Sequence, residues 1–543
     1  MRIVAIGGVA AGASAAAKAR RENEDAEIII LEKGPYISFA NCGLPYYIGG
    51  EIENKKDLII WSAKKFEKMY NVRVFVKREV RDIDPENKEI EVEGLRNKKT
   101  ERLSYDRLIY APGATSISLP FFRGKNLFAL RDLPDAVRIR DFVEREKPQT
   151  ALIIGAGFIG LEVVEAFVRR GLRVTLVELM PQVLPNMDPD IAGYVEKELR
   201  DMGVDVRLNR GVKDFVLRED SIIEALLDNG EKIPCDLVFA SIGVKPGTKL
   251  AMKAGIELGK KGIRVNERME TSVKDIFAAG DIVESIDMVT GKPAWVALAG
   301  PANQQGRVAG ANAAGGNLKF RGTLGTFIIR VGGMAAAKTG LSEIEAKKEG
   351  YDFFPVHLHP PNHAGYYPGA ETLNMKIVVE KGGRILGAQI AGRSGVDKRI
   401  DVLSTAIFFG ADIRDLEHLN LAYAPPFGSA RDPVNMAGLV GSHLVNGEVE
   451  PCYARNGGLF LDVRTDKEWE SKHVENAIHM PMDVIRERIG ELDRSRAMVT
   501  YCREGYRSYL AYRILKQRGF HVKNYVGGYL TYLANKEADR DNP

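Results

Sequence analysis

The chain has 543 residues and a nearly balanced charge, with 77 Lys and Arg against 73 Asp and Glu and a formal net charge of +4. A chain of this length is too long to fold around a single hydrophobic core, so we expect roughly three or four domains. The basic residues form no tract, so we expect no nucleic-acid binding. No apolar run reaches membrane-spanning length, so we expect no membrane span. Four cysteines are too few for a disulfide scaffold, so we predict a cytoplasmic protein.

A short apolar run over residues 2–6 opens the chain, and we interpret it as a buried strand because it lacks the basic leader and cleavage site of a signal peptide. It leads into a glycine-rich turn over residues 7–12, an alanine-rich helical stretch, and a second apolar run over residues 27–31 that ends at Glu32. This order predicts that a pyrophosphate approaches the helix N-terminus and that the acid meets a ribose hydroxyl. Val9 replaces the middle glycine of G-x-G-x-x-G.

Cys42 follows within the segment 38–46 and has no second cysteine nearby. Enzymes that work with two thiols need them a few residues apart, so that one thiol attacks a bond that the other has made. The partner must therefore come from outside the chain, as a small thiol in a mixed disulfide, a sulfane sulfur, or the oxygen of a sulfenic acid. Because the next residues predict a turn into a helix, we expect the pKa of the Cys42 thiol to be lowered.

A second dinucleotide pattern begins with the apolar run 151–154. It continues through a complete G-x-G-x-x-G over residues 155–160, a helix, and a strand over residues 173–177 that ends at Glu178. Two such units imply two bound dinucleotides. An acid at this place accepts a bond from a ribose 2′-hydroxyl and repels a 2′-phosphate, so Glu178 predicts a preference for NADH over NADPH.

Three further segments connect these units. Residues 105–114 and 240–243 have the pattern of strand-to-turn crossings between two such domains. Residues 271–281 add a strand that ends at Asp281, whose carboxylate is placed to bond the ribityl chain of a flavin.

The middle of the chain predicts a different kind of domain. Residues 324–440 alternate short apolar strands with a helix, and residues 441–455 loosen into a predicted linker. Cys452 lies in this linker, and the sequence predicts no role for it. Cys235 lies in an apolar run and is predicted to be a buried small hydrophobic residue.

The last ninety or so residues predict another domain, with strand signals at residues 459–464, 477–481 and 498–501. The third strand leads directly into Cys502, and Arg507 follows before a helix. Backbone N–H groups at a helix N-terminus and an arginine stabilise a thiolate, and equally a persulfide anion.

Together these motifs resemble the two-dinucleotide flavoprotein disulfide reductases over roughly residues 1–440, followed by a segment that resembles a rhodanese domain. The resemblance implies an α/β fold class: two Rossmann-like dinucleotide-binding domains, an α+β dimerisation domain and a C-terminal rhodanese-like α/β domain. The implied boundaries are 1–114 with 245–323 for FAD, 115–244 for NAD(P)H, 324–440 for dimerisation, 441–455 for the linker and 456–543 for the rhodanese-like domain.

The resemblance also implies cofactor-binding residues. Those expected at FAD are Gly7, Gly8, Ala11, Gly12, Glu32, Lys33, Asn41, Gly113, Asp281 and Ala299. Those expected at the nicotinamide dinucleotide are Gly155, Gly157, Gly160, Glu178 and Gly243. No metal site is predicted.

The segment around Cys42 is similar to that of the CoA-disulfide reductases within this family, which carry coenzyme A on a single cysteine. Ser38 and the cations Lys18, Arg20 and Arg21 at the end of the first helix are therefore expected to hold CoA. Members of this kind use tyrosines of the other subunit for proton or thiolate handling, and Tyr367 and Tyr423 match them. No matching His-Pro pair is present, and His418 and His443 are predicted to be structural.

The resemblance implies a homodimeric, NAD(P)H-dependent reductase of CoA disulfide, CoA persulfide or polysulfide. Cys42 would carry CoA as a mixed disulfide, while Cys502, with Arg507, would relay sulfane sulfur. Two alternatives stay open. One is an NADH oxidase or peroxidase that uses a Cys42 sulfenic acid, and the other is a sulfur carrier whose rhodanese loop serves a partner protein.

Overall fold

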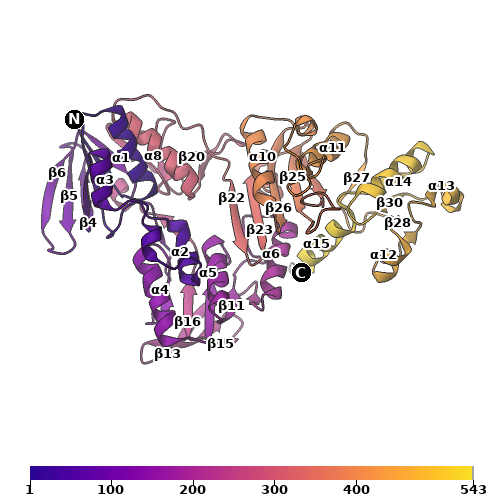
Figure 1. Cartoon of the computed structure of the whole chain (residues 1–543), viewed down its shortest axis with the longest axis horizontal. Helices are drawn as coiled ribbons and strands as arrows, with labels where there is room; N and C mark the ends of the chain where they lie inside the picture. The colour runs from indigo at the N-terminus through magenta and orange to yellow at the C-terminus, as the bar shows by residue number, and fades with distance from the viewer. Residues whose placement is uncertain (541–543) are drawn as a thin grey trace. The chain divides into compact units, whose positions relative to one another are not determined.

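The computed structural model describes residues 1–540, which form two compact units (Figure 1). The first contains residues 1–179 and 203–325, and the second contains residues 180–202 and the chain from Thr326 onward. Within the described part of the chain, none of the helices combines the length and the apolar character needed to cross a bilayer.

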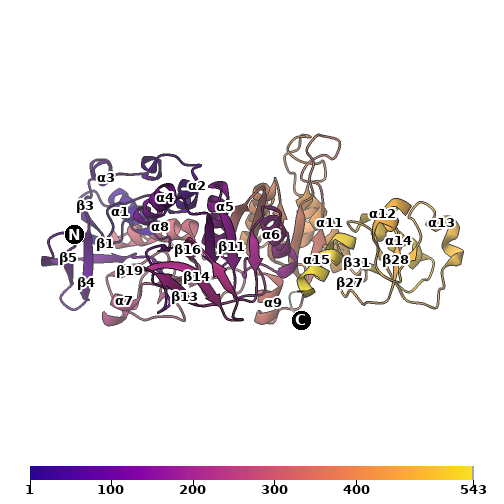
Figure 2. The same cartoon turned by 90° about the horizontal axis from the view of Figure 1, so that it is seen from below.

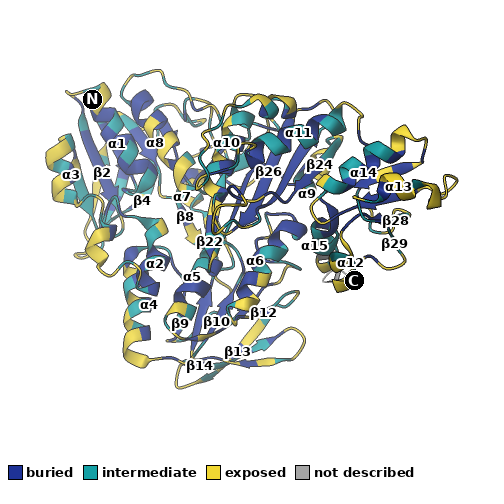
Figure 3. Ribbon diagram, turned by 45° about the vertical axis from the view of Figure 1, so that its right-hand side comes forward, coloured by how far each residue is buried: buried dark blue, intermediate teal, exposed yellow. Residues whose placement is uncertain are grey.

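A parallel five-stranded sheet forms the first dinucleotide-binding fold of the first unit, in the order β19-β7-β1-β2-β3. Its strands are β1 (Arg2–Ile6), β2 (Glu27–Glu32), β3 (Arg73–Val76), β7 (Arg107–Tyr110) and β19 (Ile276–Ala278). They are rich in apolar residues because both faces are covered, one by helices and the other mainly by a small antiparallel sheet over residues 78–104, and Figure 3 shows β2 buried. The helical elements of this part are α1 (Ala10–Glu22), η1 (Asn41–Gly43), α2 (Leu44–Gly49), η2 (Lys55–Leu58), α3 (Ala63–Tyr70), α7 (Lys249–Lys253) and α8 (Ala299–Ala313).

The alanine-rich composition of α1 has a packing explanation. Helices α1 and α8 lie side by side in Figures 1 and 2. A Cβ atom on Gly306 would lie 2.2 Å from the carbonyl oxygen of Ala11, and one on Gly310 would lie 2.1 Å from that of Ala15. Only small residues permit this approach, so these residues hold α1 in place behind the glycine-rich turn.

Smaller antiparallel sheets complete this part of the first unit. They are formed by β4 (Arg78–Asp84), β5 (Glu89–Gly94) and β6 (Thr100–Ser104), and by β18 (Ile263–Arg264), β20 (Val283–Ile286) and β21 (Pro293–Trp295), where β18 and β20 run parallel. The pair β8 (Ala114–Ser116) and β17 (Val244–Pro246) joins the two predicted crossing segments.

The second parallel sheet has the order β12-β11-β10-β16-β9. Its elements are β9 (Leu127–Phe128), β10 (Thr150–Ile154), β11 (Arg173–Val177), β12 (Asp205–Arg207) and β16 (Leu237–Ala240), with the helices α4 (Leu133–Glu146) and α5 (Phe158–Arg169). An antiparallel sheet of β13 (Val212–Arg218), β14 (Ser221–Leu227) and β15 (Lys232–Pro234) shares its core.

The second unit is centred on an antiparallel sheet with the order β22-β23-β26-β25-β24. Its elements are α6 (Pro189–Asp201), β22 (Phe327–Val331), β23 (Met334–Gly340), α9 (Glu343–Glu349), β24 (Phe353–Leu358), β25 (Asn374–Glu380), β26 (Ile385–Gly392), α10 (Val396–Phe408), η3 (Ile413–His418) and α11 (Pro433–Val445). The buried Lys376 ammonium binds the carboxylates of Asp188, Asp190 and Glu343 at 3.1, 3.0 and 2.6 Å. These ion pairs tie the start of α6 to the sheet.

The C-terminal part of the second unit is a parallel sheet in the order β27-β31-β30-β28-β29. Its elements are β27 (Pro451–Cys452), β28 (Leu459–Asp462), α12 (Asp466–Ser471), β29 (Ile478–His479), α13 (Ile485–Arg488), η4 (Ile489–Glu491), β30 (Met498–Tyr501), α14 (Tyr506–Gln517), β31 (Val522–Tyr525) and α15 (Gly528–Arg540). The predicted α/β fold class is confirmed.

The structure corrects the predicted linker over residues 441–455. Helix α11 continues to Val445, and β27 already belongs to the C-terminal sheet through its pairing with β31. Cys452 is therefore a buried residue of a strand. The sequence suggested a linker because β27 has only two residues, which is too short for a hydrophobic pattern to appear.

Candidate functional site

The first glycine-rich turn connects β1 to α1 without side-chain caps. Gly7 has a φ of +94°, and a Cβ atom there would lie 2.2 Å from the carbonyl oxygen of Ala111. A Cβ atom on Gly12 would lie 1.8 Å from the oxygen of Gly7. The turn therefore requires glycine at both positions. The first N–H groups of α1, around Gly8 and Ala11, have no carbonyl partner within the helix and can bind an anion.

Glu32 ends β2 beside this turn. Its carboxylate accepts hydrogen bonds from the N–H groups of Gly8 at 2.7 Å and Gly34 at 2.6 Å. Burial raises the pKa of this carboxyl group, and the two hydrogen bonds from the backbone only partly offset that rise. Lys33, which the resemblance also assigned to FAD, pairs with Glu79 at 2.9 Å and is exposed.

Four other residues expected at FAD lie in the same unit. The Oδ1 atom of Asn41 is buried and has no hydrogen-bond partner among the described residues. Asp281 lies 3.6 Å from the guanidinium of Arg131, and burial raises the pKa of the Asp281 carboxyl group. Gly113 has a φ of +74°, and α8 starts at Ala299 without a side-chain cap.

These residues fit a flavin dinucleotide. The glycine turn accommodates a pyrophosphate, Glu32 is placed for ribose hydroxyls, and the unpartnered buried oxygen of Asn41 requires a donor that the described protein residues do not supply.

Cys42 lies in η1, immediately before α2. Its thiol is exposed. Partial desolvation, and then the carboxylates of Glu162 and Asp281, raise the pKa of this thiol. The expected lowering of the pKa is therefore wrong for the protein alone. The sequence showed the helix start but not Glu162, which comes from α5, about 120 residues further along the chain.

The second glycine-rich turn connects β10 to α5. Gly155 has a φ of +100°, and its Cβ atom would lie 2.3 Å from the oxygen of Ser241, while a Cβ atom on Gly160 would lie 2.0 Å from the oxygen of Gly155. A Cβ atom on Gly157 would meet open space within 4 Å. Space above the middle glycine is what a closely approaching pyrophosphate requires.

Glu178 closes this second site at the end of β11. Its carboxylate is buried and accepts a hydrogen bond from the N–H of Ala156 at 2.6 Å. Gly243, at the return crossing, has a φ of +105°. The acid thus lies against the glycine turn, in the place where the sequence analysis expects a ribose.

The cations expected at CoA are only partly available. Arg20 is buried, and its guanidinium donates to five backbone carbonyl groups, including those of Tyr70 and Asn71 at 3.0 and 2.7 Å. The expectation that Arg20 meets a phosphate is therefore wrong, because it holds two loops together. Lys18 pairs with Glu22, whereas Arg21 is exposed. Ser38 has a φ of +44°, and its N–H donates to the oxygen of Gly8 at 2.8 Å.

The two tyrosines expected to act with Cys42 belong to the second unit. The hydroxyl of Tyr423 lies 3.0 Å from that of Tyr366, and both side chains are exposed. The ring of Tyr367 instead contacts that of His363 edge-on, with centroids 5.7 Å apart. The structure thus brings Tyr366 onto Tyr423, and the sequence could not separate Tyr366 from its neighbour Tyr367.

Cys502 lies at the start of the C-terminal loop and is buried. Its Sγ accepts a hydrogen bond from the N–H of Gly505 at 3.1 Å, and Gly505 precedes α14 with a φ of +107°. The carbonyl group of Cys502 accepts from the N–H of Tyr529 at 2.7 Å. Of the predicted cradle, the structure thus shows one backbone N–H group bonded to the sulfur, that of Gly505 immediately before α14.

Arg507 also faces this sulfur, and a residue that the sequence analysis missed holds it. The guanidinium of Arg507 donates to both carboxylate oxygens of Glu468 at 2.7 Å. This bond raises the pKa of the Arg507 guanidinium. The charge of Cys502 also raises it, whereas partial burial lowers it. Glu468 lies 39 residues earlier, on α12. The capping pattern of Thr465 and Glu468 was the only signal in the sequence.

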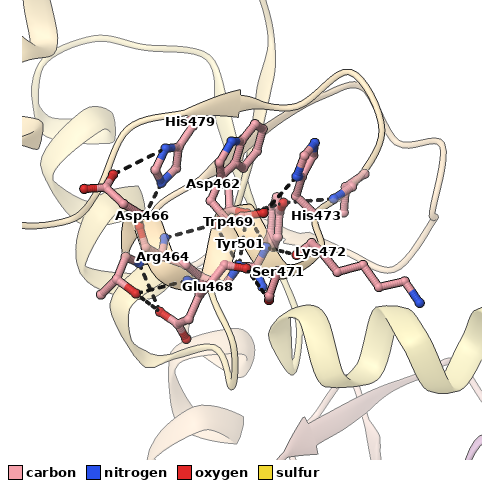
Figure 4. Close-up of polar contacts among 12 residues, drawn as sticks. Asp462, Arg464, Asp466, Glu468, Trp469, Ser471, Lys472, His473, His479 and Tyr501 are labelled. Atoms are coloured by element: carbon pink, nitrogen blue, oxygen red, sulfur yellow. Dashed lines mark hydrogen bonds and ion pairs between the residues drawn. The ribbon is translucent and has the colours of Figure 1, made fainter.

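Buried polar contacts hold the end of β30, directly before Cys502 (Figure 4). Tyr501 donates its hydroxyl to Asp462, and Asp462 also pairs with Arg464 at 2.6 Å. Trp469 is stacked between the rings of His473 and His479, with centroids 3.6 and 4.7 Å away. These contacts position α12, and therefore Glu468, next to the loop.

The remaining candidates are structural. Cys235 is buried, and burial raises the pKa of its thiol to about 12. Cys452 donates its thiol to the oxygen of Ala454 at 3.5 Å. His443 stacks on Tyr509 with centroids 4.8 Å apart, and His418 ends η3.

Comparison with protein families assigns all three parts of the chain. Residues 1–306 match the family described as pyridine nucleotide-disulphide oxidoreductase. Residues 329–433 match the dimerisation domain of the same family, and residues 451–535 match the rhodanese-like domain.

Curated relatives cover the part before the rhodanese-like domain. The chain is 34% identical over 441 residues to a protein of Methanocaldococcus jannaschii named NADH oxidase, covering 80% of this chain and 98% of the relative. It is 34% identical over 440 residues to the coenzyme A disulfide reductase of Staphylococcus haemolyticus, again covering 80% of this chain and 98% of the relative.

Two solved structures cover nearly the whole chain. The reduced CoADR-RHD of Bacillus anthracis is 40% identical, with a TM-score of 0.96, and covers 99% of this chain and 98% of its own. The NAD-dependent persulfide reductase of A. fulgidus is 39% identical, with a TM-score of 0.92, and covers 98% of this chain and 100% of its own.

Proposed function

Because the chain belongs to the pyridine nucleotide-disulphide oxidoreductase family, we propose that it uses NAD(P)H to reduce CoA disulfide, CoA persulfide or polysulfide through Cys42. FAD, when bound, supplies the transfer of an electron pair from the nicotinamide to sulfur. The dimerisation domain supports a homodimer as the active form. The names of the Staphylococcus and A. fulgidus proteins support this substrate class.

The observation that carries the proposal is the isolation of Cys42. The other cysteine of the first unit, Cys235, is buried, so no exposed second thiol of that unit is available to Cys42 among its described residues. A single thiolate reduces a disulfide by attacking one sulfur while the other leaves as a thiolate with the electron pair. We propose that the resulting mixed disulfide between Cys42 and CoA is the resting form, and that its two-electron reduction would free CoA and the Cys42 thiolate.

Mass spectrometry of the intact protein tests this directly. The oxidised protein is expected to carry an adduct of the mass of CoA that a reductant removes and that is absent from Cys42→Ser. An added oxygen on Cys42, with no CoA adduct, would contradict the proposal. That outcome would support the second candidate, an NADH oxidase that works through a sulfenic acid, which the name of the Methanocaldococcus jannaschii relative favours.

The tyrosine pair provides a prediction about proton handling. We expect Tyr423→Phe to lower kcat about tenfold or more while the CoA adduct remains, because the variant loses a hydroxyl that hydrogen-bonds a charged leaving thiolate. Steady-state turnover with CoA disulfide is the measurement.

Two neighbouring variants serve as matched controls. Since Tyr366 and not Tyr367 bonds Tyr423, Tyr366→Phe is expected to affect turnover and Tyr367→Phe to leave it nearly unchanged. Unchanged turnover in Tyr423→Phe would assign this residue to packing, and a large loss in Tyr367→Phe alone would restore the assignment made from the sequence.

Cofactor choice is the next prediction. We expect NADH to be preferred over NADPH, because the Glu178 carboxylate at the second glycine turn accepts from a 2′-hydroxyl and repels a 2′-phosphate. The variant Glu178→Ala is expected to lower the ratio of kcat/KM with NADH to kcat/KM with NADPH about tenfold or more.

Arg210 provides a control for this measurement, because it is a cationic residue whose backbone N–H donates to the Glu178 carbonyl group at 3.0 Å. The variant Arg210→Ala alone is expected to keep the preference for NADH. A clear NADPH preference in the unmodified protein would contradict the placement of Glu178 at the ribose.

A further inference from the structure

The loop around Cys502 carries less positive charge than its sequence suggests. The cation that faces the sulfur, Arg507, is already bound by both oxygens of Glu468 at 2.7 Å. The same carboxylate accepts from the N–H and the hydroxyl of Thr465, both at 3.0 Å. Glu468 is therefore held rigidly by its own helix start as well as by Arg507, and an incoming anion meets an arginine that is already paired.

Glu468 keeps its negative charge under ordinary conditions. Its bond to Arg507, against the opposing effect of partial burial, lowers the pKa of the Glu468 carboxyl group to about 2. With Cys502 as a thiolate, the two negative charges of Cys502 and Glu468 therefore exceed the single positive charge of Arg507. The next charges along the loop, Arg503 and Glu504, lie 3.6 Å apart and cancel in the same way.

We propose that Glu468 is a specificity-determining residue of the sulfur-transfer site, because its charge disfavours donors whose reacting group is a dianion, relative to donors whose reacting group carries a single charge, such as persulfides. This inference rests on the proposed function of Cys502 as a sulfur acceptor. With any donor the step is the same. The Cys502 thiolate bonds the terminal sulfane sulfur, the donor's S–S bond breaks, and the remainder leaves with the electron pair while Cys502 becomes a persulfide.

Two donors that differ in charge but not in this step provide the test. Thiosulfate is a dianion and releases sulfite, whereas methanethiosulfonate is a monoanion and releases methanesulfinate. Cyanide then removes the outer sulfur of the Cys502 persulfide as thiocyanate and restores the thiolate. The ratio of kcat/KM for the two donors, measured on the full-length holoenzyme, reports the charge at the site.

The variant Glu468→Gln removes the charge and keeps a carbonyl oxygen for Arg507. We expect kcat/KM to rise about tenfold with thiosulfate and about threefold with methanethiosulfonate, because the Coulomb energy scales with donor charge. The matched control is Glu470→Gln, an exposed residue of the same helix, which is expected to leave the ratio unchanged. Equal changes for the two donors in Glu468→Gln would overturn the proposal, since a structural role affects both alike.

A measurement on the unmodified protein keeps the test independent of how the variant folds. Salt screens repulsion, so raising the ionic strength is expected to increase transfer from thiosulfate more than transfer from methanethiosulfonate. A decrease with thiosulfate would overturn the proposal. If neither donor forms a persulfide on Cys502 in the unmodified protein, the proposed function of this loop is wrong. If persulfide forms but the ratio of kcat/KM for the two donors does not change in Glu468→Gln, only the role of Glu468 is wrong.

Discussion

Replacing Cys42 with serine is expected to abolish the reduction of CoA disulfide, with a loss of about a thousandfold or more, while FAD stays bound. A serine hydroxyl is not ionised near neutral pH, so it cannot replace the thiolate that bonds the substrate sulfur. The glycine turn and Glu32, which we propose bind FAD, lie on other elements than Cys42, so we expect the flavin to be retained. NADH oxidation with CoA disulfide and the absorbance of bound flavin are the two measurements.

The variant Cys235→Ala is the control from the same unit. Its thiol is buried and its pKa is raised to about 12, so we expect reductase activity to survive and stability to fall slightly. Retention of most activity in Cys42→Ser would refute the single-thiol mechanism. Loss of flavin from that variant would instead show that Cys42 supports the cofactor site.

Replacing Cys502 with serine is expected to abolish sulfur transfer from persulfide or thiosulfate to cyanide. Reduction of small disulfides that reach Cys42 directly is expected to continue at close to the rate of the unmodified protein. The reason is that the two sulfurs belong to separate units, each with its own surroundings: Cys42 lies in η1, and Cys502 lies in the loop between β30 and α14. Assays of both activities on one preparation make the comparison.

Cys452→Ala is the matched control for this variant, because it removes the other thiol of the C-terminal part, which bonds only a nearby carbonyl group in the described structure. It is expected to keep both activities. If reduction of small disulfides fell to background in a folded Cys502→Ser protein, the two sulfurs would act in one obligatory path. The proposal of two independent entry points for substrate would then be wrong.

The local features that the sequence predicted and the structure contains are those that depend on neighbouring residues in the chain. The spacing of Gly155, Gly157 and Gly160 predicted a turn, and two of these residues approach backbone oxygens so closely that a Cβ atom cannot fit. The loop from Cys502 to Arg507 is equally local, because one strand end and one helix start build its cradle.

The errors concern side chains whose partners come from elsewhere in the fold. Arg20 has the sequence pattern of a helix-end cation, yet carbonyl groups some fifty residues away occupy it. The pKa of Cys42 is raised by partial desolvation and by two carboxylates that are remote in the sequence, against the direction that the local turn predicted. The catalytic role expected for Tyr367 stays a prediction, but only the packing of its loop decides that its neighbour Tyr366 bonds Tyr423.

The sequence by itself therefore determined the fold class and the two glycine-rich turns, and it singled out Cys42 and Cys502 as candidate reactive cysteines, since each depends on a short run of residues with restricted backbone conformations. Only the tertiary structure decided the electrostatic surroundings of those cysteines. Glu162 near Cys42 and Glu468 on Arg507 come from helices remote in the sequence. Charges act through space, so their effect on a thiol depends on a distance that only the folded chain defines.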